Sequence, residues 1–207
     1  MSSTIILILI VAAVPCCGRA AFEGDYNVPA KRVIVLMFLL VGVSACNDAA
    51  RREQQIKALA SDANMLIKQD TEITRQWVNE FVKAFTEENR RKFPANREFL
   101  HTHAEQIIKL VDESSRLNNS AADKYEQAAQ LAANEQQRNG LRAFASAFRK
   151  TVEAHQLIKS QMQSVSDETL VDEKIFNDRL KHAWELAGQK QAESQQQIEE
   201  GRRMLGW

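Results

Sequence analysis

Between residues 46 and 207 the chain contains few residues that interrupt a helix. Its proline and glycine residues in this part are Pro94, Gly140, Gly188, Gly201 and Gly206. Ala, Gln, Glu, Lys and Leu, which favour helices, are abundant over the same residues. A long segment with this composition and so few helix breakers predicts an all-α structure.

Apolar residues recur at steps of three and four positions in four stretches of this segment. The stretches cover residues 56–85, 100–132, 141–165 and 171–205. That spacing places the apolar residues of each stretch on one face of a helix. The pattern therefore predicts four amphipathic helices, each with one stripe to bury.

The residues between the stretches indicate where these helices end. Phe93-Pro94 is expected to end the first helix, because proline disfavours the helical conformation of its predecessor. Asn96 can cap the start of the second helix. Residues 134–140 (NEQQRNG) break the pattern weakly, and residues 164–169 (SVSDET) form a cluster of residues that commonly cap helices.

Four amphipathic helices with short connections should pack antiparallel, up-down-up-down. We expect an elongated antiparallel bundle of about four long helices over residues 46–207, with helices roughly 45 to 65 Å long. A competing interpretation breaks the second helix at residues 117–120 (LNNS) and gives five helices.

The two ends of such a bundle differ in composition. One end gathers bulky residues: Trp77, Phe81, Phe85, Phe99, Leu100, Met162, Val165, Val171 and Phe176. The other end joins residues 50–66, 121–140 and 190–205, which are rich in Ala and Gln and place Gln191 and Ser194 in the seam. Small residues bury little apolar area, so we expect this second end to open more easily.

Two apolar runs, 5–14 and 33–45, precede this segment. Both are shorter than the roughly 20 residues that a membrane-spanning helix needs. The second run follows the basic pair Lys31-Arg32 and ends in small residues, which is the layout of a secretory signal. We therefore expect residues 1–45 to be a leader and residues 46–207 the mature domain. Initiation near Val28 would give an ordinary basic region, and a leader with two hydrophobic segments is the alternative.

Val43-Ser44-Ala45-Cys46 resembles the bacterial lipobox, in which an aliphatic residue and two small residues precede a cysteine. The resemblance implies transfer of a diacylglyceryl group to the Cys46 thiol, signal cleavage between Ala45 and Cys46, and acylation of the new amino group. In enterobacterial lipoproteins an Asp directly after the cysteine favours retention in the inner membrane. Asn47 stands there, so the resemblance favours the outer membrane over the inner membrane.

Histidines provide the candidates for metal or haem binding. His103 and His155 occupy stripe positions in different helices, where they could meet as ligands, although two ordinary half-buried histidines are the more frequent arrangement. Glu98 and His101 form one Glu-x-x-His step, whereas carboxylate-bridged di-iron bundles use two such steps. We expect Glu98 and His101 to be solvated, and we assign no metal and no cofactor.

The function that these patterns favour is non-enzymatic. The 27 basic and 27 acidic side chains balance, which argues against a nucleic-acid partner. Residues 46–207 contain no glycine-rich phosphate loop, no nucleophile with a matched histidine and no CxxC. We expect a lipid-anchored spacer or docking module for another envelope protein; the alternative is a bundle that holds a metal or haem through His103 and His155. Trp207 could also contact the lipid interface, where tryptophan is favoured.

Overall fold

The computed structural model describes residues 29–167, 169–170 and 172–207, with side chains from Asp48 onward. The chain divides into two compact units, Met1–Arg51 and Arg52–Trp207. Helix α2, Pro29–Ala84, runs through the described part of the first unit and into the second. Among the described residues, no helix combines the length and apolar character needed to span a membrane. Most of the leader predicted for residues 1–45 lies outside the described residues.

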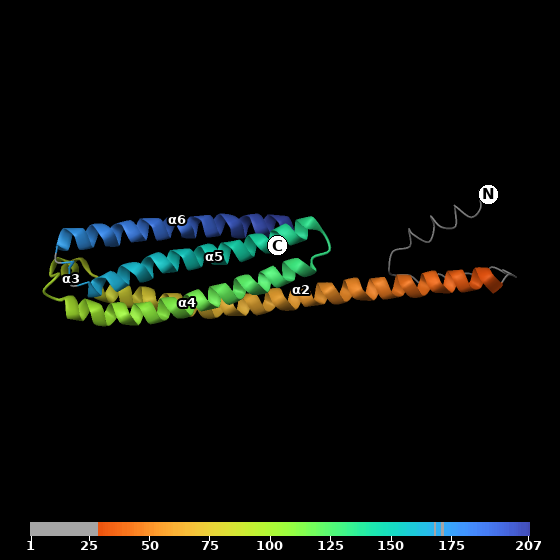
Figure 1. Ribbon diagram of the computed structural model, residues 1–207, viewed down its shortest axis with the longest axis horizontal. Helices are drawn as coiled ribbons and strands as arrows, with labels where there is room; N and C mark the ends of the chain where they lie inside the picture. The colour runs from red at the N-terminus through yellow and green to blue at the C-terminus, as the bar shows by residue number, and fades with distance from the viewer. Residues whose placement is uncertain (1–28, 168, 171) are drawn as a thin grey trace. The chain divides into compact units, whose positions relative to one another are not determined.

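Every element that the structure describes is a helix. After α2 come α3 (Glu87–Arg91), α4 (Arg97–Leu131), α5 (Glu135–Gln163), the 3₁₀ helix η1 (Ser164–Ser166) and α6 (Glu173–Leu205). Four of these are long, and in the second unit they pack against one another (Figure 1). The predicted all-α antiparallel bundle is confirmed.

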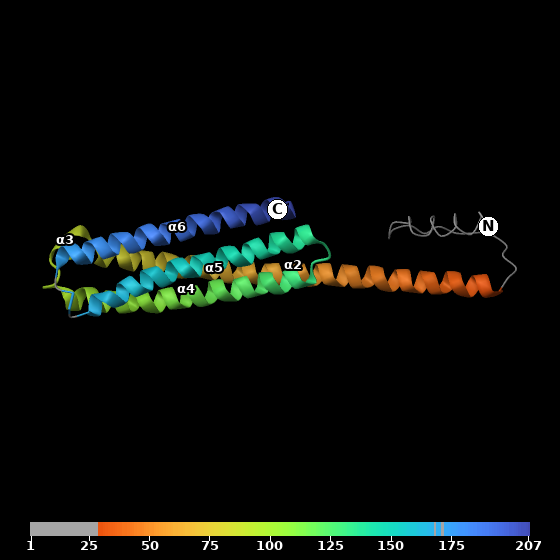
Figure 2. The same ribbon diagram turned by 45° about the horizontal axis from the view of Figure 1, so that its top comes forward.

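Ion pairs give the direction of neighbouring helices. Asp62 of α2 pairs with Lys124 of α4, whereas Glu80, further along α2, pairs with His103, which comes earlier in α4. Successive pairs along α2 thus run backwards along α4, which makes these helices antiparallel. The views in Figures 1 and 2 show α4, α5 and α6 continuing the same alternation. Stacking of Trp77 on Trp184, with ring centroids 6.0 Å apart, brings α6 back against α2.

Helix α4 continues without interruption through residues 117–120, so the five-helix interpretation is wrong. Leu117 and Asn118 are both buried there. The Asn118 side chain donates a 3.0 Å hydrogen bond to the carbonyl of Ser114, one turn earlier. Residues 117–120 are of a type that often forms loops, but they stay helical because Leu117 and Asn118 face the core.

The end of α2 lies earlier than Phe93-Pro94, which corrects the predicted boundary. Helix α2 ends at Ala84, and Thr86 starts the separate helix α3, its hydroxyl accepting a 3.2 Å hydrogen bond from the Asn89 backbone. Asn96 stands at the start of α4 but makes no capping bond. Its amide instead donates to the carbonyl of Asn89 at 2.7 Å, tying α4 to α3.

Helix α5 begins at Glu135, within the segment 134–140 that the sequence marked as a break. The side chain of Asn134 accepts a 2.8 Å hydrogen bond from the Gln137 backbone, which caps the helix and lets it start there. The break between α4 and α5 is therefore confined to residues 132–134. Asp172 caps α6 in the same manner, at 3.0 Å from the Ile175 nitrogen.

The core divides into two clusters, one at each of the two ends that the sequence predicted to differ in composition. The first, at the end of the bundle that carries α3, includes Trp77, Phe85, Leu100, Met162 and Phe176. The second includes Ile56, several alanines and an aromatic stack of Tyr125 on Phe144 and Phe148. Two positions differ from expectation: Phe99 is 44% exposed and Gln191 is exposed. The expectation for Val171 lies outside the described residues.

Two glycines bring α5 and α6 close together in the second cluster. A Cβ atom on Gly201 would lie 2.9 Å from the Gly140 carbonyl oxygen and equally close to the Phe144 ring. A Cβ atom on Gly140 would lie 2.7 Å from Leu205. Both positions therefore require glycine for close helix packing.

Candidate functional site

Buried polar side chains separate the two apolar clusters. They come from all four long helices and are Asp70, Ser114, Ser115, Asn118, Thr151, His155 and Ser194. We call this set the polar layer. Asp70, Ser114, His155 and Ser194 stand where an apolar residue of the stripe would otherwise continue, so the helix periodicity aims them at the core. Burial of this many polar groups is costly unless they bond to one another.

Ser114 lies at the centre of the polar layer. Its hydroxyl donates to a carboxylate oxygen of Asp70 and lies 3.4 Å from Nδ1 of His155. Because its single hydrogen is used by Asp70, the His155 contact is best made by an N–H on Nδ1 that donates to the serine oxygen. Ser115 Oγ lies 3.5 Å from the same nitrogen, and Thr74 donates to Asp70 at 3.5 Å.

A second bond in the polar layer joins α5 to α6. The hydroxyls of Thr151 and Ser194 lie 3.1 Å apart, and both side chains are buried. Together with Asp70, Ser114 and His155, this pair means that each of the four long helices has a polar bond to a neighbour at mid-bundle. Such bonds fix the register of the helices, because sliding by one turn would leave each partner unpaired.

Burial lowers the pKa of His155, since a charged imidazole loses its hydration in the core. The Asp70 carboxylate opposes this shift through its charge, and the effect of burial is larger. His155 is therefore held in its neutral form at neutral pH. Its ring edge packs against Trp77, with centroids 6.2 Å apart.

The order of groups in the polar layer does not suit nucleophilic catalysis. A serine nucleophile needs the imidazole between its hydroxyl and the carboxylate, so that the imidazole takes the hydroxyl proton. Here the hydroxyl lies between His155 and Asp70, and Ser114 has no exposed surface that a substrate could reach. The polar layer is built to hold helices together.

The structure does not bring His103 and His155 together. His103 pairs with Glu80 of α2 and packs its ring against Phe99, with centroids 4.5 Å apart. His155 lies level with Ser114, which is eleven positions after His103 in α4 (114 − 103). At 1.5 Å per residue those levels are about 16 Å apart along the helix axis, too far to share a metal or haem.

Glu98 and His101 also find separate surroundings. His101 Nδ1 lies 2.8 Å from the Ser166 hydroxyl, and its other nitrogen lies 3.5 Å from Glu105. Glu98 is exposed. No group of three or more His, Cys, Asp or Glu side chains suited to a metal ion occurs among the residues that the structure describes.

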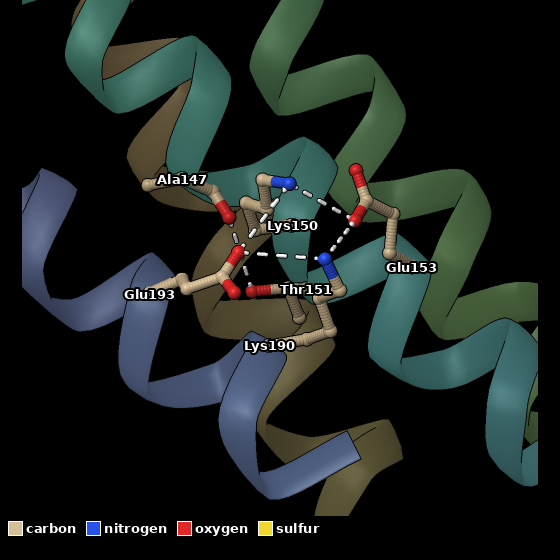
Figure 3. A network of polar contacts seen from close by, with 6 residues as sticks. All are labelled: Ala147, Lys150, Thr151, Glu153, Lys190 and Glu193. Atoms are coloured by element: carbon tan, nitrogen blue, oxygen red, sulfur yellow. Dashed lines mark hydrogen bonds and ion pairs between the residues drawn. The ribbon is translucent and has the colours of Figure 1, made fainter. Parts of the chain in front are cut away.

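A network of four charges lies on the surface of α5 and α6 beside Thr151 (Figure 3). Lys150 pairs with Glu153 at 3.1 Å and with Glu193 at 3.4 Å. Lys190 pairs with the same two carboxylates, at 3.1 and 3.5 Å. Hydrogen bonds from Lys150 and Lys190 lower the pKa of Glu153. The alternating signs satisfy all four groups and join the two helices.

Cys46, with Val43, Ser44 and Ala45, belongs to α2, but these side chains lie outside the described ones. The lipidation and cleavage predicted at Ala45 and Cys46 therefore stay predictions. Comparison with known proteins adds no relative: no family model, no curated protein and no solved structure matches the chain.

Sequence reasoning singled out His155 but missed that it belongs to a set. Asp70, Ser114 and Ser194 each occupy a stripe position that should hold an apolar residue. In an antiparallel bundle, residues 70, 114 and 155 fall at the same level of their helices. The sequence signal for the polar layer was therefore a polar residue that interrupts each apolar stripe at the same level of the bundle.

Proposed function

We propose that this protein is a lipid-anchored component of a bacterial cell envelope whose helical bundle acts as a spacer and docking module. The observation that carries the proposal is the position of Cys46. The lipobox-like residues 43–46 end six positions before Arg52, where the second compact unit begins (52 − 46). An acyl group on Cys46 would therefore be separated from the start of the second unit by only six positions of chain.

The anchor follows from the chemistry of lipidation. A single acyl chain holds a protein only marginally, whereas two or more give stable attachment. Diacylglyceryl transfer to the Cys46 thiol and acylation of its amino group would supply three chains. Asn47 favours sorting to the outer membrane.

Exposed apolar side chains support docking at the opposite end of the bundle. Val82 (65% exposed), Phe99 (44%) and Ile175 (47%) each lie within three residues of a helix terminus at the end that carries α3. The second unit begins at Arg52, in the part of α2 that precedes Ile56 and the second apolar cluster, away from the α3 end. A partner held at the α3 end would be kept away from the membrane by about the length of α4, roughly 50 Å.

Photocrosslinking in living cells tests the docking role. A photoreactive amino acid is placed at Val82, Phe99 or Ile175. Met65 is the matched control because it is exposed (54%) but comes earlier in α2, away from the α3 end. We expect one envelope protein to crosslink from the three positions at the α3 end and not from position 65. Equal crosslinking from Met65, or none from the other three, would contradict the docking role.

A further inference from the structure

The last turn of α6 is held firmly against the start of α5. The Gln136 side chain donates a 2.8 Å hydrogen bond to the carbonyl of Met204. Gly206 takes the left-handed conformation, with φ of 70°, and ends the helix, while the Trp207 nitrogen donates to the Arg202 carbonyl at 3.1 Å. These bonds give Trp207 a defined position.

The Trp207 side chain is nevertheless 59% exposed. The other two tryptophans of the chain stack on each other: Trp77 is buried in the core, and Trp184 packs against it partly buried. Trp207 touches only the edge of the second cluster, with its ring centroid 5.8 Å from that of Phe144. A large apolar ring is thus fixed in place while most of its surface faces outward.

Trp207 lies at the end of the bundle where the second unit begins. Leu205 packs on the same apolar cluster as Ile56, four residues after Arg52. Cys46 is six residues before Arg52, a stretch that spans at most about 20 Å when fully extended. A membrane attached to Cys46 would therefore come close to Trp207.

The surroundings of Trp207 suit the headgroup region of a bilayer. Tryptophan is enriched at this depth, where its apolar ring is buried while its N–H stays near water. Arg202 and Arg203, in the last turn of α6, are exposed and can reach lipid phosphates. Glu199 and Glu200, one turn earlier, are also exposed. The two glutamates repel lipid phosphates and so offset the attraction of the two arginines. The indole of Trp207 is therefore the principal contact.

We propose that Trp207 inserts into the lipid headgroup region as a second membrane contact. This inference rests on the proposed anchor at Cys46. One acylated site allows the bundle to pivot, whereas two separate contacts restrict its tilt and point the α3 end in a fixed direction. The partner of this surface is the bilayer that carries the anchor.

Fluorescence of the acylated protein in vesicles of phosphatidylethanolamine and phosphatidylglycerol tests this. Subtracting the emission of the Trp207→Phe variant from that of the wild type isolates Trp207 without altering the core tryptophans. Lipids brominated near the glycerol backbone should quench this difference emission several-fold more than lipids brominated near the chain ends. Aqueous iodide should quench it weakly.

The two proposals fail in different ways. If the chain floats with the vesicles and carries acyl groups, but Trp207 is quenched by iodide and not by brominated lipid, the Trp207 contact is wrong and the anchor stands. If the chain carries no acyl group and does not float, both proposals are wrong. Circular dichroism confirms that Trp207→Phe keeps the helical fold.

Discussion

Ser114 Oγ lies 3.4 Å from His155 Nδ1 in the middle of the bundle, while its own hydrogen bonds to Asp70. Replacing Ser114 with alanine removes the hydroxyl to which both Asp70 and His155 are hydrogen-bonded in the core. The Ser114→Ala change should lower the free energy of unfolding by about 1 to 3 kcal/mol. Urea unfolding measures this. Ser160→Ala, on the exposed face of α5, is the matched control and should change stability by less than about 0.5 kcal/mol.

The stability of the bundle should depend on pH through His155. Burial holds the pKa of His155 below its usual value of 6.5, so the unfolded chain binds more protons than the folded chain between the two pKa values. The contribution of neutral His155 is complete above pH 6.5 and is lost as the pH falls from there towards the lowered pKa. Urea unfolding at several pH values between 5 and 8 measures the slope.

Two single substitutions, one at His155 and one at an exposed histidine, test whether His155 causes this pH dependence. His155→Gln keeps a polar side chain but removes the titrating group, and should flatten the slope near pH 6. His182→Gln, at an exposed site of α6, should leave the slope unchanged. A slope that survives in the His155→Gln variant would show that another group governs the acid sensitivity.

Alanine substitutions at two glycines of α6 should change the stability of the protein in opposite directions, because only Gly201 lies where α5 and α6 approach closely. Gly201→Ala places a Cβ atom 2.9 Å from Gly140 and from Phe144, and should destabilise the protein by about 1 to 3 kcal/mol. At Gly188 nothing lies within 4 Å of an added Cβ atom. Gly188→Ala should therefore stabilise the protein by about 0.5 to 1 kcal/mol, since alanine favours helices. Thermal unfolding followed by circular dichroism compares the two.

The cap at Asn134 makes a prediction about the connection between α4 and α5. Its side chain accepts the Gln137 hydrogen bond, so Asn134→Ala should cost about 1 kcal/mol. Hydrogen exchange should accelerate most in the first turn of α5. Asn119→Ala, at an exposed position inside α4, is the control. Equal losses from the two variants would argue against a capping role.

Periodicity predicted the helices well because each stripe must be buried. Leu100, Ile107, Tyr125, Phe144 and Met162 all face the core as their spacing indicated. Helix ends were less predictable, since they depend on local bonds. Asn134 caps its helix, whereas Asn96, an equally good candidate by type, bonds to Asn89 instead. Only the path of the chain around α3 decides between these outcomes.

The polar layer was partly predictable for a similar reason. His155 was placed on a buried face from its spacing alone, and it is buried, as is Ser114 in the stretch 100–132. Their contact with each other depends on the register between α4 and α5, which spacing within one helix does not fix. His103 shows the same limit. It lies on its expected face, yet its partner is Glu80 in a neighbouring helix.

The anchor at Cys46 is the central claim, and the intact mass of the protein extracted from native membranes tests it most directly. We expect a chain that begins at Cys46 and carries the added mass of a diacylglyceryl group and an amide-linked acyl chain. A chain that retains residues before Cys46, or that has an unmodified thiol at this position, would contradict it.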